Sequence, residues 1–164
     1  ALRSDRHDFL IEDLMILVAE PPVLSEAFEP ARSVLRSCVR KPWQKLTRAV
    51  GKTKADSPEE MWHRIRIKAK QARYAAEAVA PVLGDGYRSL AKELERATDT
   101  LGDRQDAAVS IHVLRDIAET APGRTAYSLG IIAAECGHQG HSFQQDFSRR
   151  WPKTKQRAEA LGLD

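Results

Sequence analysis

The sequence contains few cysteines, few aromatic residues and no long apolar run. Its 164 residues include only two cysteines, three tryptophans, three tyrosines and four phenylalanines. Cys38 and Cys136 lie far apart and form no C-x-x-C pattern, which fits free thiols in a reducing compartment better than a disulfide-stapled secreted fold. No stretch approaches 18 uncharged apolar residues, and the N-terminus has no continuous apolar core of the signal-peptide kind. We therefore expect a soluble cytoplasmic protein that does not enter the membrane.

The sequence also lacks the local motifs of common enzyme classes. It has no glycine-rich phosphate loop of the Walker or Rossmann kind, and no Ser/His/Asp or Cys/His motif. Asp103 and Asp106 could hold magnesium as a carboxylate pair, but aspartates more often cap a helix interruption such as the one expected at Gly102. We therefore expect no catalytic residues and no cofactor.

A metal site near the C-terminal end has only weak support. Its candidate ligands are Cys136, His138, His141, Asp146 and His112. Their spacing does not closely match a known zinc pattern, so a polar helix face is the simpler interpretation. We expect no metal site.

The residues that are present indicate an all-α protein. The composition is 42% hydrophobic and 30% charged, which excludes global disorder. Leu10, Leu14 and Leu17 illustrate apolar spacings of three, four and seven, and no sustained alternation typical of strands occurs. We expect an antiparallel bundle of about five helices in one domain over residues 1–164. Residues 1–55 would form a connector and the first two helices, and residues 57–152 the motif-bearing helices.

Proline, glycine and capping residues predict the helix boundaries. The expected helices span about residues 5–19, 28–50, 57–83, a fourth after the turn at 84–86, and 125–150. Ser57 and Glu60 have the spacing of a capping box. We expect Pro42 to kink or end the second helix and Pro152 to stop the fifth. Gly102 interrupts the pattern of the fourth, which is either one long bent helix or two collinear ones. Three tryptophans are interpreted as core or interface anchors: Trp43, Trp62 and Trp151.

The charge is unevenly distributed along the chain. The formal net charge is only +3, and residues 1–29 contain seven acidic and two basic side chains. Residues 30–76 contain thirteen basic and three acidic side chains, a net charge of +10. The total therefore hides a basic block that could meet a polyanion.

A basic stripe stands out within this block. It consists of His63, Arg66, Lys70 and Arg73, at positions i, i+3, i+7 and i+10. These residues fall on one arc of a helix over about 15 Å, beside the arc expected to face the core. Like charges at this spacing repel one another, and no acidic residue occurs between positions 61 and 76. A linear polyanion would suit this stripe, because arginine makes two-pronged bonds to phosphate and lysine supplies a point charge.

Other interpretations of the stripe remain open. A charge run is often only a solvated helix face, but the second helix adds further cations that make a shared patch: Arg32, Arg36, Arg40, Lys41, Lys45 and Arg48. The same cations could bind nucleic acid, which we rank below polyphosphate, or an acidic protein partner. A phosphohydrolase, a phosphotransferase or an accessory module of one is a further alternative.

Two motifs resemble the CHAD family, the conserved-histidine α-helical domain. Its signature helix reads approximately H-x-x-R-x-x-x-K-x-x-R-Y, which matches the stripe followed by Tyr74. Downstream, the segment at residues 101–106, LGDRQD, is similar to the family's L-G-x-x-N-D, with Gln105 where asparagine is usual. The two motifs occur in the family's order on predicted helices.

This resemblance implies a function and a set of site residues. Family members bind inorganic polyphosphate, associate with polyphosphate granules, and are often joined to a triphosphate-hydrolysing CYTH domain. Tyr74 would pack the helix and border the site. By resemblance, the polyphosphate-contacting residues would be His63, Arg66, Lys70 and Arg73, with Arg36, Arg40 and Lys92 as further members.

The resemblance also implies an incomplete binding unit. A whole family domain has two similar helical halves, each with a histidine-and-arginine helix around a basic surface, and this sequence has one such helix. Residues 1–164 are therefore interpreted as the C-terminal half plus the connector between the halves. Association of two copies into a homodimer is a hypothesis for how a full cavity could form.

Overall fold

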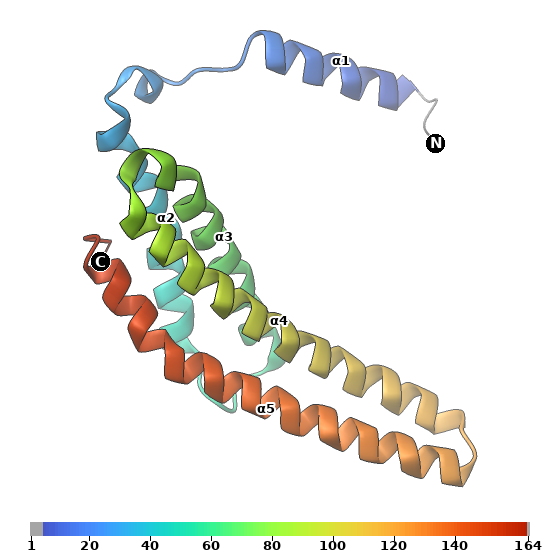
Figure 1. Cartoon of the computed structure of the whole chain (residues 1–164). Helices are drawn as coiled ribbons and strands as arrows, with labels where there is room; N and C mark the ends of the chain where they lie inside the picture. Colours follow the sequence, from blue (N-terminus) through green and yellow to red (C-terminus); the bar gives the residue numbers. More distant parts are fainter. Residues whose placement is uncertain (1–4, 164) are drawn as a thin grey trace. The chain divides into compact units, whose positions relative to one another are not determined.

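The computed structural model describes residues 5–163, apart from the side chain of Glu26. It contains five α-helices and one short 3-10 helix over that range (Figure 1): α1 (Asp5–Ala19), η1 (Ser25–Phe28), α2 (Ala31–Lys52), α3 (Glu59–Leu83), α4 (Asp85–Thr120) and α5 (Gly123–Glu159). Residues 5–163 form no strand. The prediction of an all-α protein with about five helices is confirmed.

The chain divides into two compact units, Ala1–Val34 and Leu35–Asp164. The first unit contains α1, whose bounds match the prediction from the sequence, and η1. Helix α1 buries none of its residues, although Leu14 and Leu17 are apolar. It ends before Pro21 and Pro22, as expected from proline's missing N–H and the restriction that proline places on its predecessor.

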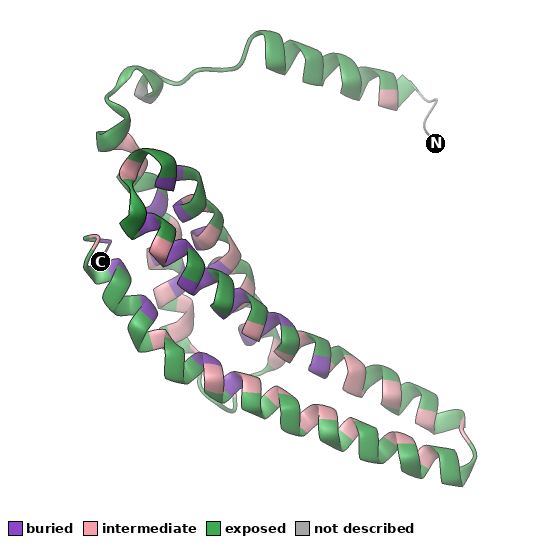
Figure 2. Cartoon of the chain, in the orientation of Figure 1, coloured by how far each residue is buried: buried purple, intermediate pink, exposed green. Residues whose placement is uncertain are grey.

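The core of the second unit lies where residues of α2, α3, α4 and the C-terminal part of α5 meet, the region with most of the buried residues in Figure 2. Aromatic rings link these helices. Trp43 of α2 stacks on Trp151 of α5 with ring centroids 5.4 Å apart, and Phe147 meets Trp62 of α3 edge-on at 6.1 Å. Trp43 and Trp62 are buried and Trp151 is half-buried, which confirms their expected role as core anchors.

Pro42 and Pro152 lie inside helices. The sequence predicts that Pro42 kinks or ends its helix and that Pro152 ends its own. Helix α2 continues past Pro42, and α5 continues past Pro152 to Glu159, so the predicted stop at Pro152 is wrong. Each proline adjoins one tryptophan of the stacked Trp43–Trp151 pair. A proline inside a helix costs about 3 kcal/mol, and burial of large aromatic side chains is a term of similar size. The packing of the tryptophans therefore offsets the local penalty.

Helix α4 runs without a break through Gly102, so of the two alternatives from the sequence it is one long helix and not two collinear ones. Gly102 is buried, and the space beside it is occupied by the guanidinium of Arg66. Asp103 and Asp106 are exposed within the continuous helix and therefore cap no break. The glycine is retained at a close helix contact, which favours a small residue despite a helix penalty of about 1 kcal/mol.

The start of α3 also differs from the prediction. Pro58 occupies the N-cap position and makes no side-chain capping bond. The hydroxyl of Ser57 instead accepts a hydrogen bond of 2.8 Å from the backbone N–H of Lys54, so the expected capping box with Glu60 is wrong. The end of α3 at Leu83 agrees with the sequence, and Gly84 follows with a φ of 97°, a conformation that favours glycine.

Helices α4 and α5 run antiparallel beside each other, joined at Ala121 and Pro122 (Figure 1). An ion cluster ties them together at Glu93 of α4, whose side chain is only 7% exposed. Its Oε1 atom lies 3.3 Å from Lys153 Nζ and 3.5 Å from Arg157 Nε of α5, and 3.3 Å from Arg96 Nη1. No helix among the described residues is both long enough and apolar enough to cross a membrane.

Candidate functional site

The basic stripe of the sequence lies on the side of α3 that borders α4. The buried positions of α3 include Ile65, Ala69 and Ala72, which face the core. His63, Arg66, Lys70 and Arg73 fall on the adjoining side of the same helix and are all half-buried. The helix period thus places the stripe at the edge of the core, where its charges are partly shielded from water.

His63 is oriented by a residue of α4. Its Nδ1 atom lies 3.1 Å from the side-chain oxygen of Gln105. An amide oxygen can only accept, so Nδ1 donates the proton in this contact. Nε2 is then the ring nitrogen that remains for contact with a ligand.

Arg66 lies across α4 at Gly102. A Cβ atom added to Gly102 would lie 3.4 Å from Arg66 Nε and 3.5 Å from Nη2. The Nε atom is buried and has no hydrogen-bond partner within the described structure. A buried donor without a partner is costly, and a bound acceptor would satisfy it.

Arg73 contacts three neighbours. Its Nε lies 3.2 Å from the Glu77 carboxylate, and its Nη1 donates to the hydroxyl of Thr98 over 3.5 Å. Its guanidinium carbon is 4.9 Å from the centre of the Tyr74 ring, which is half-exposed. Tyr74 therefore borders the stripe, and Arg73 is held against α4 by several weak contacts.

Counter-charge for the stripe is scarce. Among the described side chains, Glu77 is the only carboxylate that forms an ion pair with it, through Arg73. A neighbouring cation, Arg104 of α4, has a structural role by contrast. It forms an ion pair with Glu59, and its guanidinium lies 4.7 Å from the centre of the Trp62 ring. The stripe therefore retains most of its positive charge.

The remaining predicted site residues lie elsewhere. Arg36 and Arg40 are exposed on α2, one turn apart, and Lys92 is exposed on α4. None of these three lines the groove described below. Their assignment to the site stays a prediction.

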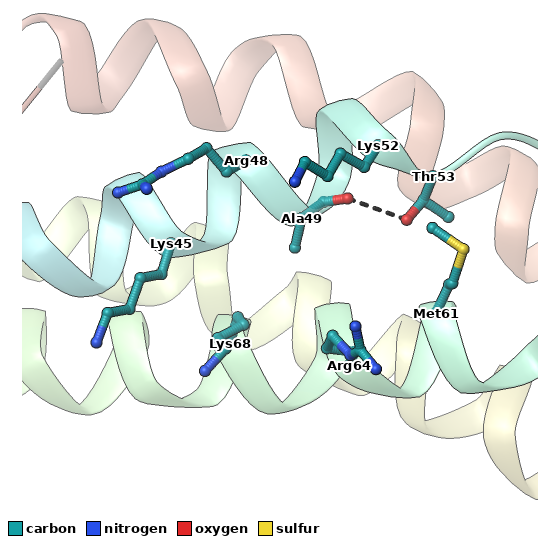
Figure 3. Close-up of a pocket in the computed structure, with 8 residues that line it drawn as sticks. All are labelled: Lys45, Arg48, Ala49, Lys52, Thr53, Met61, Arg64 and Lys68. Atoms are coloured by element: carbon teal, nitrogen blue, oxygen red, sulfur yellow. Dashed lines mark hydrogen bonds between the residues drawn. The ribbon is translucent and has the colours of Figure 1, made fainter.

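A second group of cations lines a groove between α2 and α3 (Figure 3). The groove has a volume of about 330 Å³. Five of its lining residues are basic and none is acidic: Lys45, Arg48 and Lys52 from α2, and Arg64 and Lys68 from α3, with Ala49, Thr53 and Met61 completing the lining. We call this set the α2–α3 groove.

The sequence contains a pattern that indicates this groove, two pairs of basic residues at helical spacing, which the predicted stripe does not include. Arg48 and Lys52 are four residues apart on one helix, as are Arg64 and Lys68 on the next, so each pair occupies one face. At 100° per residue, Arg64 lies about 160° around α3 from Arg66, on a different face from the stripe. Only the packing of α2 against α3 brings the two pairs together.

The weak metal candidates do not assemble. No three His, Cys, Asp or Glu side chains gather in a metal-binding geometry in the described part of the chain. Asp146 is instead engaged by two arginines of α5, with Arg150 Nε 3.1 Å from its carboxylate. The hydrogen bond from Arg149, together with the charge of Arg150, lowers the pKa of Asp146.

Comparison with protein-family models identifies the family of the chain. The family model of the CHAD domain matches residues 1–115, more than two thirds of the sequence. The chain belongs to the CHAD family. No curated protein and no solved structure matches it.

The matched CHAD segment contains both motifs noted in the sequence. It includes the whole stripe on α3 and the segment of α4 around Gly102 and Gln105. Gln105 stands where the family pattern has asparagine, and it contacts the stripe histidine directly. The two CHAD motifs, about 40 residues apart in the sequence, thus meet across the α3–α4 interface.

Proposed function

We propose that this CHAD domain is a non-enzymatic module that binds inorganic polyphosphate through the stripe of His63, Arg66, Lys70 and Arg73. Membership of the CHAD family supports this proposal, because the domain is reported to bind polyphosphate. The observation that carries it is the row of four basic side chains with a single carboxylate partner among the described residues.

The geometry of the stripe suits a chain of phosphates better than one phosphate. Its residues span about 15 Å along α3, since each residue adds 1.5 Å. The guanidinium groups of Arg66 and Arg73 can each offer two parallel N–H donors to phosphate oxygens, and Lys70 adds a point charge. Their half-buried position strengthens each charge contact, because fewer water molecules screen it.

The position of His63 supports a role at one end of the row. Gln105 holds the ring by Nδ1, so a phosphate would meet the Nε2 side. In its protonated form the ring would donate from Nε2 to a phosphate oxygen. The stripe would act by holding phosphate groups, without breaking a bond in them.

The proposal extends to the cell. A domain that binds polyphosphate in the cytoplasm would associate with polyphosphate granules. Arg36, Arg40 and Lys92 are proposed as outer contacts for a longer chain that continues past the stripe. Assembly of two copies into a homodimer would double the number of stripes available to one chain.

The test replaces three stripe residues and compares them with a charge-matched control. The stripe variant is Arg66→Gln/Lys70→Gln/Arg73→Gln, and the control is Arg88→Gln/Arg115→Gln/Arg124→Gln, three exposed arginines of α4 and α5. Binding of long-chain polyphosphate is measured by titration calorimetry at 50 and 200 mM salt. We expect the affinity for polyphosphate to fall at least about tenfold in the stripe variant and to change less than about twofold in the control. Equal losses in both variants would contradict the site.

Competition separates polyphosphate from nucleic acid. Both are linear polyanions, so each could occupy a basic row. We expect single- and double-stranded DNA to displace polyphosphate only at a large excess of phosphate groups. Displacement at equal phosphate concentration would favour a nucleic-acid-binding domain instead.

A further inference from the structure

The α2–α3 groove concentrates positive charge that no carboxylate among the described residues neutralises. Its five basic residues come from two helices, and none of them forms an ion pair with a carboxylate in the described structure. Two of its pairs have like charges one helical turn apart, Arg48 with Lys52 and Arg64 with Lys68, an arrangement that destabilises a helix. A bound anion would relieve this repulsion.

The donors of the groove are largely free for a ligand. Arg48 donates only its Nε–H, to the backbone oxygen of Gln44 over 3.2 Å, which leaves both terminal amino groups of its guanidinium. Lys68 donates to the side-chain oxygen of Gln71 over 3.3 Å, one of its three N–H groups. The hydroxyl of Thr53 donates a hydrogen bond of 3.0 Å to the backbone oxygen of Ala49, shown by the dashed line in Figure 3, so its hydrogen is not available to a ligand.

The dimensions of the groove indicate a short anion. The cations of α2 extend over about 10 Å from Lys45 to Lys52, and those of α3 over about 6 Å from Arg64 to Lys68. A volume of about 330 Å³ is at the lower end of small-molecule sites. Ala49 and Met61 add apolar surface to the lining, which a simple solvated basic face would not need (Figure 3).

We propose that the α2–α3 groove is a binding site for a triphosphate group, separate from the stripe on the other side of α3. The site rests on the same phosphate chemistry as the proposed function and adds to it a second surface with a preference for short chains. Arg48 and Arg64, from opposite walls, would grip the phosphate oxygens through their guanidinium groups. The lysines would supply the remaining charge.

The triphosphate could come from two sources with the same recognised group. Inorganic triphosphate would use only the cations. A nucleoside triphosphate would in addition place its base against the apolar surface at Met61. The two sources predict different effects of removing that apolar surface.

The test measures triphosphate binding to the full chain by titration calorimetry. The groove variant is Arg64→Gln/Lys68→Gln, and its charge-matched control is Arg115→Gln/Arg124→Gln on the distal part of α4 and α5. We expect the groove variant to bind inorganic triphosphate at least about tenfold more weakly, and the control to bind it like the unaltered chain. Unchanged binding in the groove variant would overturn the proposal.

A second variant guards against a loss of folding. Lys45→Gln/Lys52→Gln removes charge from the opposite wall, and circular dichroism reports whether each variant keeps its helices. We expect both groove variants to fold and both to lose triphosphate affinity. If only one of the two groove variants lost triphosphate affinity, the proposal that both walls form one site would be wrong.

Further probes identify the source of the triphosphate. If ATP binds several-fold more tightly than inorganic triphosphate and Met61→Gln removes only that difference, the groove recognises a nucleotide. If both bind equally and adenosine does not bind, it recognises the phosphates alone. Both results support a triphosphate site, whereas binding of adenosine as tight as that of ATP would overturn it.

The two proposals fail independently. If the stripe variant retains long-chain polyphosphate binding, the proposed function loses its site, but the groove result stands. If the stripe variant loses triphosphate binding and the groove variants keep it, the groove proposal is wrong and the stripe binds both ligands.

Discussion

The guanidinium of Arg66 lies against the backbone of Gly102 across the α3–α4 interface, 3.4 Å from where a Cβ atom of residue 102 would stand. This contact joins the two CHAD motifs in space. It also explains why a glycine can lie in the middle of a helix of 36 residues without ending it. A Cβ atom at position 102 would be in van der Waals contact with the Arg66 side chain of the stripe, and a longer side chain there would have to displace it.

Substitution of Gly102 tests how tightly Arg66 is held. Alanine normally stabilises a helix interior by about 1 kcal/mol relative to glycine. We expect Gly102→Ala to gain less than this, because its Cβ meets the guanidinium at contact distance. Gly130→Ala is the control, since a Cβ there meets nothing within 4 Å. Urea unfolding measures both variants, and a larger gain at Gly102 than at Gly130 would contradict the packing described.

Replacement of Arg104 tests its structural role. Arg104 is 12% exposed, pairs with Glu59 and covers the Trp62 ring. We expect Arg104→Leu to lower the free energy of unfolding by about 2 kcal/mol, because Glu59 loses its partner and the ring contact disappears. Arg88→Leu removes an exposed pair with Asp85 and should cost less than about 1 kcal/mol. Equal losses in the two variants would argue against the structural role of Arg104.

Neutralisation of Glu93 tests the attachment of α5 to α4. This buried carboxylate faces Arg96, Lys153 and Arg157. We expect Glu93→Gln to destabilise the chain by about 1–2 kcal/mol, a value reduced from that of a fully buried pair because the three cations can regain water. Glu95→Gln, at an exposed position of the same helix, is the control. Thermal unfolding of the two variants should differ clearly, and indistinguishable curves would refute the role of the cluster.

Removal of the Gln105 side chain tests the orientation of His63. We expect Gln105→Ala to weaken polyphosphate binding by about threefold to tenfold, because a net hydrogen bond contributes about 1 kcal/mol. The double variant His63→Ala/Gln105→Ala should bind no more weakly than His63→Ala alone. Additive losses would show that Gln105 acts by a route other than the histidine.

Salt dependence counts the phosphates that the stripe neutralises. Each contact with a single-stranded polyanion contributes a slope of about 0.7 in a plot of log affinity against log salt concentration. The stripe variant with three cations removed should therefore show a slope about two units shallower than the unaltered chain. A parallel plot with a uniform drop in affinity would mean that these cations do not contact the polyanion.

The sequence by itself determined the features that depend on helical periodicity. Because a helix repeats every 3.6 residues, spacing alone predicted the helical class and the common face of His63, Arg66, Lys70 and Arg73. The two prolines at positions 21 and 22 predicted where α1 ends. The residues of the CHAD motifs were identified by their resemblance to the family's sequence pattern. These properties are local, so no knowledge of the packing was needed.

The tertiary structure decided what happens between helices. Stacking of Trp43 on Trp151 stabilises α2 and α5, which both continue beyond an internal proline. Helix α4 is likewise continuous through Gly102, where it packs closely against α3. The same packing brings Gln105 to His63 and assembles the α2–α3 groove from cations on two helices. Local propensities are worth a few kcal/mol at most, and burial of large side chains outweighs them, so these juxtapositions follow from the packed core and not from any one segment.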